Sequence, residues 1–568
     1  MLALTLAQLN PTIGDLDGNI ALMKAAAEKA RTDGAKLVVF PELSLTGYYP
    51  ADLLEDEDFQ RRMNVAMKTL AQASREVAEV YWVVGAPTMN DGPGKPYRNS
   101  LLVYKAGEIM LSYSKQLLPT YNIFDERRHF EPGPDVARVL RIDGVQVGVM
   151  VCEDGWNDDG HDYAVNPFQR LADAAPDLVV SINASPSNVG KREQRHDVFV
   201  KACRHHNLPL VYVNQIGGHD QLVYDGGSFI VEPSRGVVYE SQRFEQEVRT
   251  VLFDPVERTF TELNRLDLPV PTAQGLPTLE FYRQQIVLGL KDYARRCGFK
   301  QAVVGSSGGI DSALTLALAV EALGAENVVG ITMPSEYSSE GSVDDSVVLC
   351  DNLGIKLLTH PIRAQVESYK EQFLKTTGVP LQGLALENLQ ARIRGTILME
   401  YSNAFGHLLL TTGNKSEISV GYCTLYGDTN GGLGLIGDLY KTEIFALCRH
   451  MNEMAGREII PVAIIDKPPS AELAPGQKDT DSLPPYDVLD EILKTLIEGG
   501  RLAAWEKTQA QALVDDLASS DDGSALIRRI KGMIARNEYK RRQAPPILRV
   551  RSRAFGSGRQ VPIAARHY

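Results

Sequence analysis

The sequence contains few cysteines and no long apolar run. No stretch approaches the roughly 18 uncharged apolar residues of a transmembrane helix, so we expect no membrane partner. The 6 cysteines are scattered, without a CxxC pair or zinc-type spacing, which predicts reduced thiols. The adjacent His205 and His206 have no further ligand spaced to join them, so we assign them no metal. Because the N-terminus also lacks a basic leader, the sequence predicts a cytoplasmic protein.

Charge and length narrow the class of protein further. The net charge of -13 argues against a general nucleic-acid-binding surface, and we expect no nucleic-acid partner. With 44% hydrophobic and 23% charged residues, the chain has the composition of an ordinary globular protein. Its 568 residues exceed what one core holds, which predicts at least two domains.

Two unlike halves follow each other along the chain. Strand-length apolar runs recur up to residue 265, and proline and glycine then concentrate in "DLPVPTAQGLP" at 267–277. Further on, the strand-like segments "QAVVG", "NVVGITM", "IKLLTH" and "HLLLTTG" alternate with helix-length segments, which is the pattern of a doubly wound parallel sheet. We therefore predict an α/β protein with domains at 1–265 and 278–546, a linker at 266–277 and a C-terminal tail at 547–568.

Three chemically active residues lie at or near predicted strand ends in the first half. Glu42 lies in "FPELSLTGY", Lys115 in "SKQLLPTY" and Cys152 in "CEDGW". Taken singly, each has an ordinary structural explanation: a charge at a strand end, a surface lysine and a small buried hydrophobe. Taken together, they form an acyl-transfer set, because an ammonium lowers the pKa of a nearby thiol and a carboxylate handles its proton.

The same three strings resemble the nitrilase, or carbon-nitrogen hydrolase, superfamily over residues 1–260. The resemblance implies a four-layer αββα sandwich in which Cys152 attacks an amide carbonyl to form a thioester, Glu42 is the general base and Lys115 stabilises the oxyanion. In the glutaminase members of the superfamily, matching positions hold glutamine. The residues assigned to glutamine are Tyr121, Ser185 and Lys191, with Arg192 as the alternative to Lys191, and also Trp156, which otherwise packs in the core.

The second half contains a denser motif, "VVGSSGGIDSALTLALA" at 303–319, which predicts a strand, a loop of glycine and serine, and an apolar helix. Glycines allow close backbone approach, so successive N–H groups at the helix N-terminus can point at a phosphate. The loop lacks the lysine of a Walker ATPase and the GxGxxG of a dinucleotide fold. "SGGIDS" instead resembles the SGGxDS loop of the N-type ATP pyrophosphatases, which implies adenylation of a carbonyl or carboxylate oxygen. The residues assigned to ATP are Gly305, Ser306, Ser307, Gly308, Gly309, Ile310, Asp311 and Ser312, and Asp311 is also assigned to Mg²⁺.

Longer strings such as "ENLQARIRGTILMEYSN" and "GDLYKTEIF" resemble the NAD synthetases over residues 280–546. The resemblance implies ATP, Mg²⁺ and deamido-NAD (nicotinate adenine dinucleotide), and a homo-oligomer such as an octamer. It assigns Thr412 to ATP, Glu417 to the dinucleotide and the metal, and Asn388, Arg394, Lys441 and Lys540 to the dinucleotide and its phosphates.

An amidase that releases ammonia and a synthetase that consumes it, joined in one chain, imply a single coupled reaction. The hypothesis is that Cys152 hydrolyses glutamine and that ammonia passes through a shielded tunnel to deamido-NAD adenylated by ATP, giving NAD, glutamate, AMP and pyrophosphate. Three alternatives stay open: transfer to a different carboxylate, a plain amidase with a regulatory ATP domain, and a non-catalytic nucleotide-binding protein. The acid that triggers pyrophosphate release distinguishes the first of these, and uncoupled amidase activity distinguishes the second.

Overall fold

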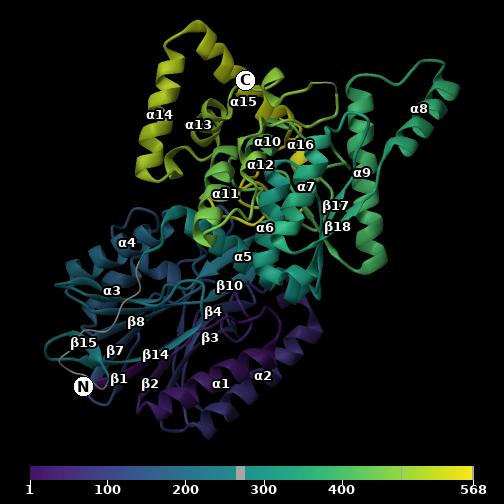
Figure 1. The fold of residues 1–568 in the computed structure, drawn as a ribbon. Coiled ribbons are helices and arrows are strands. Elements are labelled where there is room, and N and C mark those ends of the chain that lie inside the picture. Colours follow the sequence, from purple (N-terminus) through teal and green to yellow (C-terminus); the bar gives the residue numbers. More distant parts are fainter. Residues whose placement is uncertain (264–274, 475, 566–568) are drawn as a thin grey trace. The chain divides into compact units, whose positions relative to one another are not determined.

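The computed structural model describes residues 1–263, 275–474 and 476–565, and it divides into two compact units (Figure 1). Unit 1 comprises Met1–Gly217 and Tyr224–Gly275, and unit 2 comprises Gly218–Val223 and Leu276–Tyr568. The linker predicted at 266–277 lies almost entirely outside the described residues. Within the described ranges, no helix has the length and apolar character needed to cross a membrane.

Unit 1 is built on two β-sheets, each with a mixture of parallel and antiparallel neighbours. The first has the order β15 (Thr259–Glu262), β14 (Glu247–Asp254), β1 (Leu2–Gln8), β2 (Leu37–Val39), β3 (Tyr81–Met89), β4 (Tyr97–Lys105) and β5 (Glu108–Ser114). The second has the order β13 (Gly236–Glu240), β12 (Phe229–Glu232), β9 (Leu210–Asn214), β8 (Leu178–Asn183), β7 (Val145–Val151) and β6 (Val139–Ile142). A separate two-stranded ribbon pairs β10 (Ile216–His219) with β11 (Leu222–Asp225), and its residues 218–223 are assigned to unit 2.

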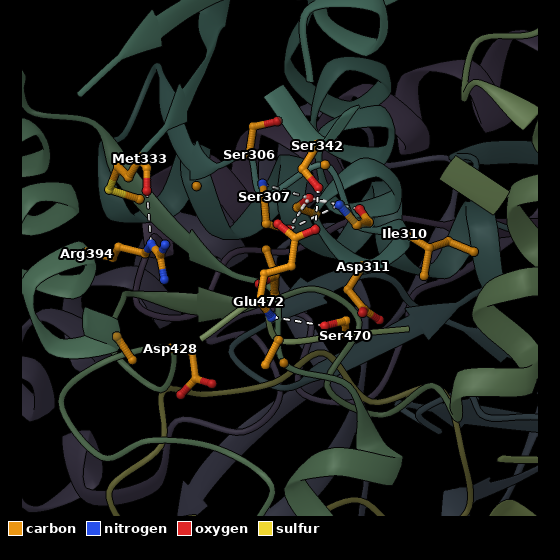
Figure 2. Close-up of a pocket in the computed structure, with 18 of the residues that line it drawn as sticks. Ser306, Ser307, Ile310, Asp311, Met333, Ser342, Arg394, Asp428, Ser470 and Glu472 are labelled. Atoms are coloured by element: carbon orange, nitrogen blue, oxygen red, sulfur yellow. Dashed lines mark hydrogen bonds between the residues drawn. The ribbon is translucent and has the colours of Figure 1, made fainter. Parts of the chain in front are cut away.

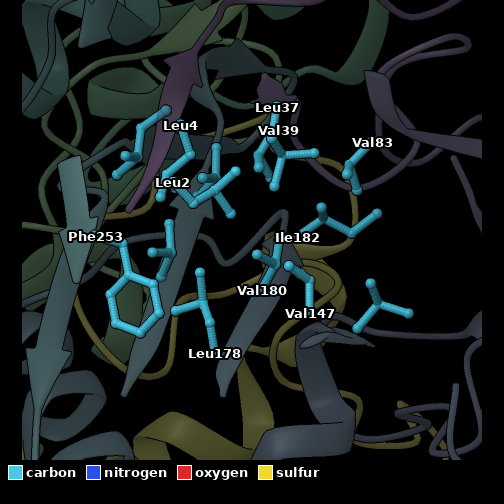
Figure 3. Close-up of a cluster of buried hydrophobic side chains, with 14 of the residues drawn as sticks. Leu2, Leu4, Leu37, Val39, Val83, Val147, Leu178, Val180, Ile182 and Phe253 are labelled. Carbon is cyan, nitrogen blue, oxygen red and sulfur yellow. The ribbon is translucent and has the colours of Figure 1, made fainter. Parts of the chain in front are cut away.

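One hydrophobic core joins the inner faces of these two sheets (Figure 3). Alternate residues of a strand face the same side, so Leu2 and Leu4 of β1 both enter this core. Val147 of β7 and Val180 of β8 enter it from the second sheet. The alternation in the sequence thus places one side of each strand between the sheets and leaves the other side for helices.

Helices cover the outer face of each sheet. α1 (Leu16–Thr32) and α2 (Glu57–Glu76) pack on the first sheet, and α3 (Pro167–Asp173) and α4 (Lys191–His206) pack on the second. α1 begins at Asp15, whose carboxylate accepts a hydrogen bond from the Gly18 N–H, as expected for a helix N-cap. These four layers confirm the predicted αββα sandwich.

Unit 2 contains a five-stranded parallel sheet with the order β18 (Lys356–Thr359), β17 (Val328–Thr332), β16 (Ala302–Gly305), β19 (Leu408–Thr411) and β20 (Leu433–Gly434). From β16 the chain first builds outward through β17 and β18, and then on the other side through β19 and β20. The strand order therefore reverses between β16 and β19, where sheets of this type bind ligands beyond the carboxyl ends of the strands. The predicted doubly wound sheet is confirmed.

Helices lie on both faces of this sheet. α9 (Leu384–Phe405) contacts β16 and β19, and on that side Val303 and Leu409 share a core with Ile393 and Ile397. α6 (Ile310–Leu323) contacts β16 and β17. The helices of unit 2 are α5 (Thr278–Cys297), α6 (Ile310–Leu323), α7 (Glu340–Leu353), α8 (Arg363–Thr377), α9 (Leu384–Phe405), α10 (Lys415–Val420), α11 (Lys441–Ala455), α12 (Val462–Asp466), α13 (Tyr486–Ile497), α14 (Ala504–Ala518), α15 (Asp521–Arg536) and α16 (Glu538–Arg541).

The first residues of the segment predicted as a C-terminal tail, 547–568, pack into unit 2. Ile547 forms a β-bridge with Gly434 at the edge of the sheet. Arg551 is completely buried and forms ion pairs with Glu443, with Glu498 at 2.8 Å and with Glu506 at 2.7 Å. A buried guanidinium with three carboxylate partners fixes this part of the tail against α11, α13 and α14.

Candidate active sites

Glu42 lies just beyond the carboxyl end of β2, and it is completely buried. β3 approaches it so closely that only glycine fits at position 85, because a Cβ there would lie 2.2 Å from a backbone nitrogen of the Glu42 turn. The carboxylate accepts hydrogen bonds from Lys115 Nζ at 2.8 Å, Asn99 Nδ2 at 2.7 Å and the Ala184 N–H at 3.0 Å. These donors compensate the cost of burying a charge at the end of a strand.

Lys115 connects two buried carboxylates. Its Nζ donates to Glu42 and, at 2.6 Å, to Glu126, which also accepts a hydrogen bond from the Tyr48 hydroxyl. Burial disfavours the charge of Lys115, but the two carboxylates hold its pKa well above the usual value. Burial and the neighbouring Glu42 raise the pKa of Glu126, against the opposing effect of Lys115. Sequence reasoning missed Glu126, because nothing in "FDERRHF" distinguishes an inward carboxylate from exposed ones.

Cys152 directly follows β7 at the start of a short 3-10 turn. Its φ of 44° is a left-handed conformation, uncommon for a residue with a side chain. Asp154 anchors this turn, because its carboxylate accepts hydrogen bonds from the N–H groups of Gln116 at 3.0 Å and Leu117 at 2.9 Å. The turn that presents the thiol is thus tied to the segment that carries Lys115.

The surroundings of Cys152 disfavour its thiolate form. Burial, followed by the negative charge of Glu42, raises the pKa of Cys152 well above its usual value, and Lys115 opposes this shift without outweighing it. The expected effect of Lys115 is present, since it lowers the pKa of Cys152, but burial and Glu42 outweigh it. A thiol with this pKa needs a base when it attacks, and Glu42 is the carboxylate that acts on it most strongly.

Glu153, next to Cys152 in the sequence, accepts hydrogen bonds from two tyrosine hydroxyls. Tyr121 donates to Glu153 Oε1 at 3.0 Å and Tyr163 donates to the same atom at 2.8 Å. Tyr121 remains 47% exposed, so it lies at the solvent side of the site. The structure thus brings the predicted Tyr121 beside Cys152 and adds Glu153 and Tyr163, of which only Glu153 was visible in the "CED" string.

Lys191 and Arg192 have different partners. Lys191 Nζ lies 3.8 Å from the centre of the Trp156 ring, a cation–π contact at the start of α4. Arg192 binds the carboxylate of Glu240 through Nε at 2.8 Å and through Nη2 at 2.5 Å. Because Trp156 follows Cys152 by only four residues, this geometry favours Lys191 over Arg192 as the cation of the thiol site.

Ser185 follows β8 and is 4% exposed. Its hydroxyl accepts a hydrogen bond from Arg195 Nε at 3.1 Å, and Arg195 also forms a buried ion pair with Asp225 at 2.9 Å. Sequence reasoning missed Arg195, because an arginine in the middle of a helix normally points to solvent. The predicted Ser185 is thus held in place by a buried guanidinium.

In unit 2, the loop of glycine and serine connects β16 to α6 at the reversal point of the sheet. Gly308 has a φ of 73°, and a Cβ there would lie 2.3 Å from the Ser342 carbonyl oxygen, so the loop requires glycine at this position. The hydroxyls of Ser307 and Ser312 hydrogen-bond at 3.1 Å. Within the described part of the chain the buried Ser306 hydroxyl has no hydrogen-bond partner, which leaves it to a ligand such as phosphate.

A pocket of about 290 Å³ opens at this loop (Figure 2). Its wall continues through the ends of β17 and β19, the start of α10 and residues 467–473. The predicted ATP, metal and dinucleotide residues that line it are Gly305, Ser306, Ser307, Gly308, Gly309, Ile310, Asp311, Ser312, Arg394, Thr412, Glu417 and Lys441.

Lys441 lies between two carboxylates of this pocket. Its Nζ is 2.5 Å from Asp311 Oδ2 and 3.1 Å from Glu417 Oε1. Burial opposes its charge, but these carboxylates raise the pKa of Lys441 above its usual value. Burial also raises the pKa of Glu417 to about 7, although Lys441 acts against it. Asn414, which sequence reasoning passed over, donates to Asp311 at 3.0 Å and caps α10 by accepting from the Glu417 N–H at 2.9 Å.

The pocket also contains charged groups with spare capacity for a ligand. Arg394 donates from Nε to the Met333 carbonyl at 3.1 Å (Figure 2), and burial lowers the pKa of Arg394 to about 10. Asp479 lines the pocket and is 4% exposed, and its Oδ1 has no hydrogen-bond partner among the described residues. Asp479 was not predicted, since "QKDTD" resembles an exposed acidic turn.

Two predicted dinucleotide residues are not among those that line the pocket. Asn388 accepts a hydrogen bond from the Thr424 hydroxyl at 2.7 Å. Lys540 donates at 2.8 Å to the carbonyls of Gly421 and Cys423, and it lines a smaller neighbouring pocket that shares Glu417. Asn388 and Lys540 therefore hydrogen-bond to nearby residues of the protein and do not line the main pocket.

Two known protein families match the chain, one on each side of the boundary between the two units. The carbon-nitrogen hydrolase family model matches residues 3–261, and the NAD synthase family model matches residues 282–544. Together with the two sites, these matches define a class of enzyme that joins an amidase-type domain to a synthase domain.

Relatives of that class align from end to end. The glutamine-dependent NAD(+) synthetase of Synechocystis sp. is 42% identical over 573 residues and covers 99% of each chain. The one from Thermotoga maritima is 40% identical and covers 100% of this chain and 99% of its own. The solved structure of glutamine-dependent NAD+ synthetase from Acinetobacter baumannii, in complex with ADP, is 35% identical with a TM-score of 0.76 and covers 99% of this chain and 98% of its own. The chain therefore belongs to the family of glutamine-dependent NAD(+) synthetases.

Proposed function

We propose that this enzyme makes NAD from deamido-NAD and ATP with glutamine as the nitrogen donor, residues 1–265 acting as the glutaminase and residues 278–546 as the synthetase. The observation that carries the proposal is the pair of sites, one around Cys152 and one around the SGGIDS loop, in a chain that aligns end to end with relatives of that name. Transfer to a different carboxylate is not favoured by those relatives.

In the glutaminase reaction, Cys152 Sγ attacks the carboxamide carbon of glutamine while its proton passes to the Glu42 carboxylate. The oxygen that gains negative charge is stabilised by Lys115, and the proton on Glu42 goes to the departing ammonia. Water, deprotonated by Glu42, then attacks the thioester carbon, and glutamate is released as the C–S bond breaks and the proton passes from Glu42 to Cys152 Sγ. Lys191, with Trp156, holds the substrate carboxylate, and Tyr121 and Ser185 complete the glutamine site. The raised pKa of Cys152 supports the need for Glu42 as base.

In the synthetase reaction, a carboxylate oxygen of deamido-NAD attacks the α-phosphorus of ATP and pyrophosphate leaves. Ammonia then attacks the acyl carbon, and AMP leaves as NAD forms. The Ser306 hydroxyl, which has no hydrogen-bond partner among the described residues, and the Gly308 backbone support phosphate binding in the loop. Arg394 and Lys441 supply positive charge. The oxygens of Asp311, Glu417 and Asp479 suit Mg²⁺, which when bound neutralises phosphate charge. Asn388 and Lys540 contact the dinucleotide from the neighbouring wall.

We further propose that ammonia reaches the second site without entering bulk solvent and that the enzyme is a cytoplasmic homo-oligomer, an octamer by family resemblance. Shielding matters because ammonia in neutral water is mostly ammonium, which is not a nucleophile.

The experiment measures NAD formation from ATP, Mg²⁺ and deamido-NAD, with glutamine or ammonium as donor. Wild type should use both, and Cys152→Ala should use ammonium alone. Loss of activity with both donors in a folded Cys152→Ala protein would contradict the division of labour. Glutamine hydrolysis without NAD formation from either donor would contradict deamido-NAD as the acid substrate.

A further inference from the structure

Asp158, His205 and His206 form a group of metal-binding side chains outside both candidate active sites. The two histidines end α4, and the fold brings to them Asp158, which lies 47 residues before His205. His206 Nε2 lies 2.6 Å from Asp158 Oδ1, and His205 Nδ1 lies 3.1 Å from Asp158 Oδ2. The third ligand that the sequence spacing did not reveal is therefore present.

The group is held in place by its surroundings. The His206 ring stacks on the buried Phe168, with 5.3 Å between ring centres and 23° between planes. The Asp158 carbonyl accepts a hydrogen bond from Asn166 Nδ2 at 3.1 Å. The side chains of Asp158 and His206 are 14% and 5% exposed, whereas that of His205 is 60% exposed. An ion can therefore enter from the His205 side and meet two ligands whose positions are already fixed.

The donor set suits one class of ion. Three ligand atoms within 4.8 Å of one another can close around a single ion, because ligands bound at about 2.0–2.2 Å in a tetrahedron lie about 3.3 Å apart. Two imidazole nitrogens and one carboxylate oxygen favour zinc-type divalent ions over Mg²⁺ or Ca²⁺, which prefer oxygen. We propose that Asp158, His205 and His206 bind one divalent transition-metal ion of the zinc class, with water completing the coordination.

Such an ion fastens the end of α4 to the loop that follows the nucleophile turn. The Asn157 side chain donates to the carbonyls of Tyr163 at 3.0 Å and Val165 at 2.8 Å, and the Tyr163 hydroxyl donates to Glu153. The ion therefore acts as a structural link beside the glutamine site, and no step of the amide chemistry requires it.

Calorimetric titration of the tag-free full chain with Zn²⁺ tests the proposal. The Cys152→Ala background removes the active-site thiol as a competing ligand. We expect one tight site per chain, with affinity reduced at least tenfold by His205→Gln and by His206→Gln. His161→Gln, which changes an exposed histidine of the same loop, is the matched control and should leave the affinity unchanged.

Two results would overturn the proposal. If the parent chain binds Zn²⁺ no better than the His205→Gln/His206→Gln double variant, the group is only an ion pair at the end of a helix. If both single variants keep full affinity, the ion occupies another place, such as Asp52, Glu55 and His129. His205→Gln keeps the test informative even if changes at the buried His206 disturb folding, because most of the His205 side chain is exposed.

Discussion

Lys115 and Lys441 each lie between two carboxylates, yet their surroundings differ. Around Lys115 the partners Glu42 and Glu126 have completely buried side chains. Around Lys441 the side chains of Asp311 and Glu417 are 20% and 17% exposed and line an open pocket. The same arrangement of charges is therefore closed in one unit and open to a ligand in the other.

This difference shows what each cluster can do. The oxygens of Glu42 already accept hydrogen bonds from Lys115, Asn99 and the Ala184 N–H, so this cluster has the fixed geometry that the proposed general base needs. We propose that Asp311 and Glu417 release Lys441 when they bind a metal ion, which leaves Lys441 free to bind a phosphate. A closed cluster thus suits attack on a small amide, and an open one suits a large, highly charged substrate.

The largest expected effect is that of Lys115→Met. It removes the oxyanion partner and leaves two buried carboxylates facing each other, so glutamine-dependent NAD formation should fall at least about 10³-fold. Ammonium-dependent NAD formation should remain near wild type, because the other unit is unchanged. Parallel assays with the two donors make the measurement. An equal loss with both donors in a folded protein would break the proposed separation of the clusters.

Lys441→Met should give the opposite pattern. NAD formation should fall about 10²- to 10³-fold with either donor, because the open cluster loses its cation for phosphate. Hydrolysis of glutamine to glutamate, measured without ATP, should continue. If only the glutamine-dependent rate fell, Lys441 would serve ammonia delivery and the comparison would need revision.

Arg551→Met tests how much the C-terminal segment stabilises the unit that contains the open cluster. Arg551 pairs with Glu443, two residues after Lys441, so we expect a loss of about 3 kcal/mol in the free energy of unfolding. Burial opposes the shift, but Arg551 and Lys415 lower the pKa of Glu498 to about 2. Because the folded pKa is lowered, this stability is present above the unfolded pKa of about 4.3 and is lost as pH falls towards 2. Denaturant titrations at pH 7 and pH 3.5 measure both effects. The free energy of unfolding of the variant should depend less on pH than that of wild type.

The motifs identified Glu42 and Lys115 in one cluster and Asp311, Glu417 and Lys441 in the other, but not the full composition of either cluster. Glu42, Lys115 and Cys152 follow β2, β5 and β7, so the sequence could place each of them at a strand end. Their meeting depends on the packing of two sheets, because β7 belongs to the second sheet and β2 and β5 to the first. Glu126 comes from an irregular segment, and its inward direction depends on packing against Tyr48 and Lys115. Such long-range contacts leave no periodic signal in one sequence.

Burial was the second property that the sequence could not supply. The expected effect of Lys115 on Cys152 has the right sign, but burial and Glu42 outweigh it. The doubly wound parallel sheet of unit 2 was inferred from alternating segments, whereas the contribution of residues after 546 was not, because "ILRVRSRAF" is short and highly charged. Arg551 is buried only because three acidic partners from other helices surround it.

Glu42→Gln sharpens the account of the closed cluster. The thiolate is the form that reacts with iodoacetamide, and Glu42 is one of the groups that raise the Cys152 pKa. Removing its charge lowers that pKa, so the alkylation profile should shift to lower pH and alkylation near pH 7 should be faster than in wild type. Glutamine turnover should nevertheless fall at least about 10²-fold, because the base is lost. Slower alkylation in the variant would mean that Glu42 already holds the thiol proton in the resting enzyme.

The smallest expected effect is that of Lys191→Met, which tests whether Lys191 or its neighbour Arg192 binds the carboxylate of glutamine. Lys191 faces Trp156, whereas Arg192 is held by both oxygens of Glu240. Lys191→Met should raise the KM for glutamine about five- to tenfold with little change in kcat, since an exposed point charge contributes about 1 kcal/mol to substrate binding. Arg192→Met is the matched control and should leave the KM for glutamine near wild type. The reverse result would assign the substrate carboxylate to Arg192 and require Glu240 to release it when glutamine binds.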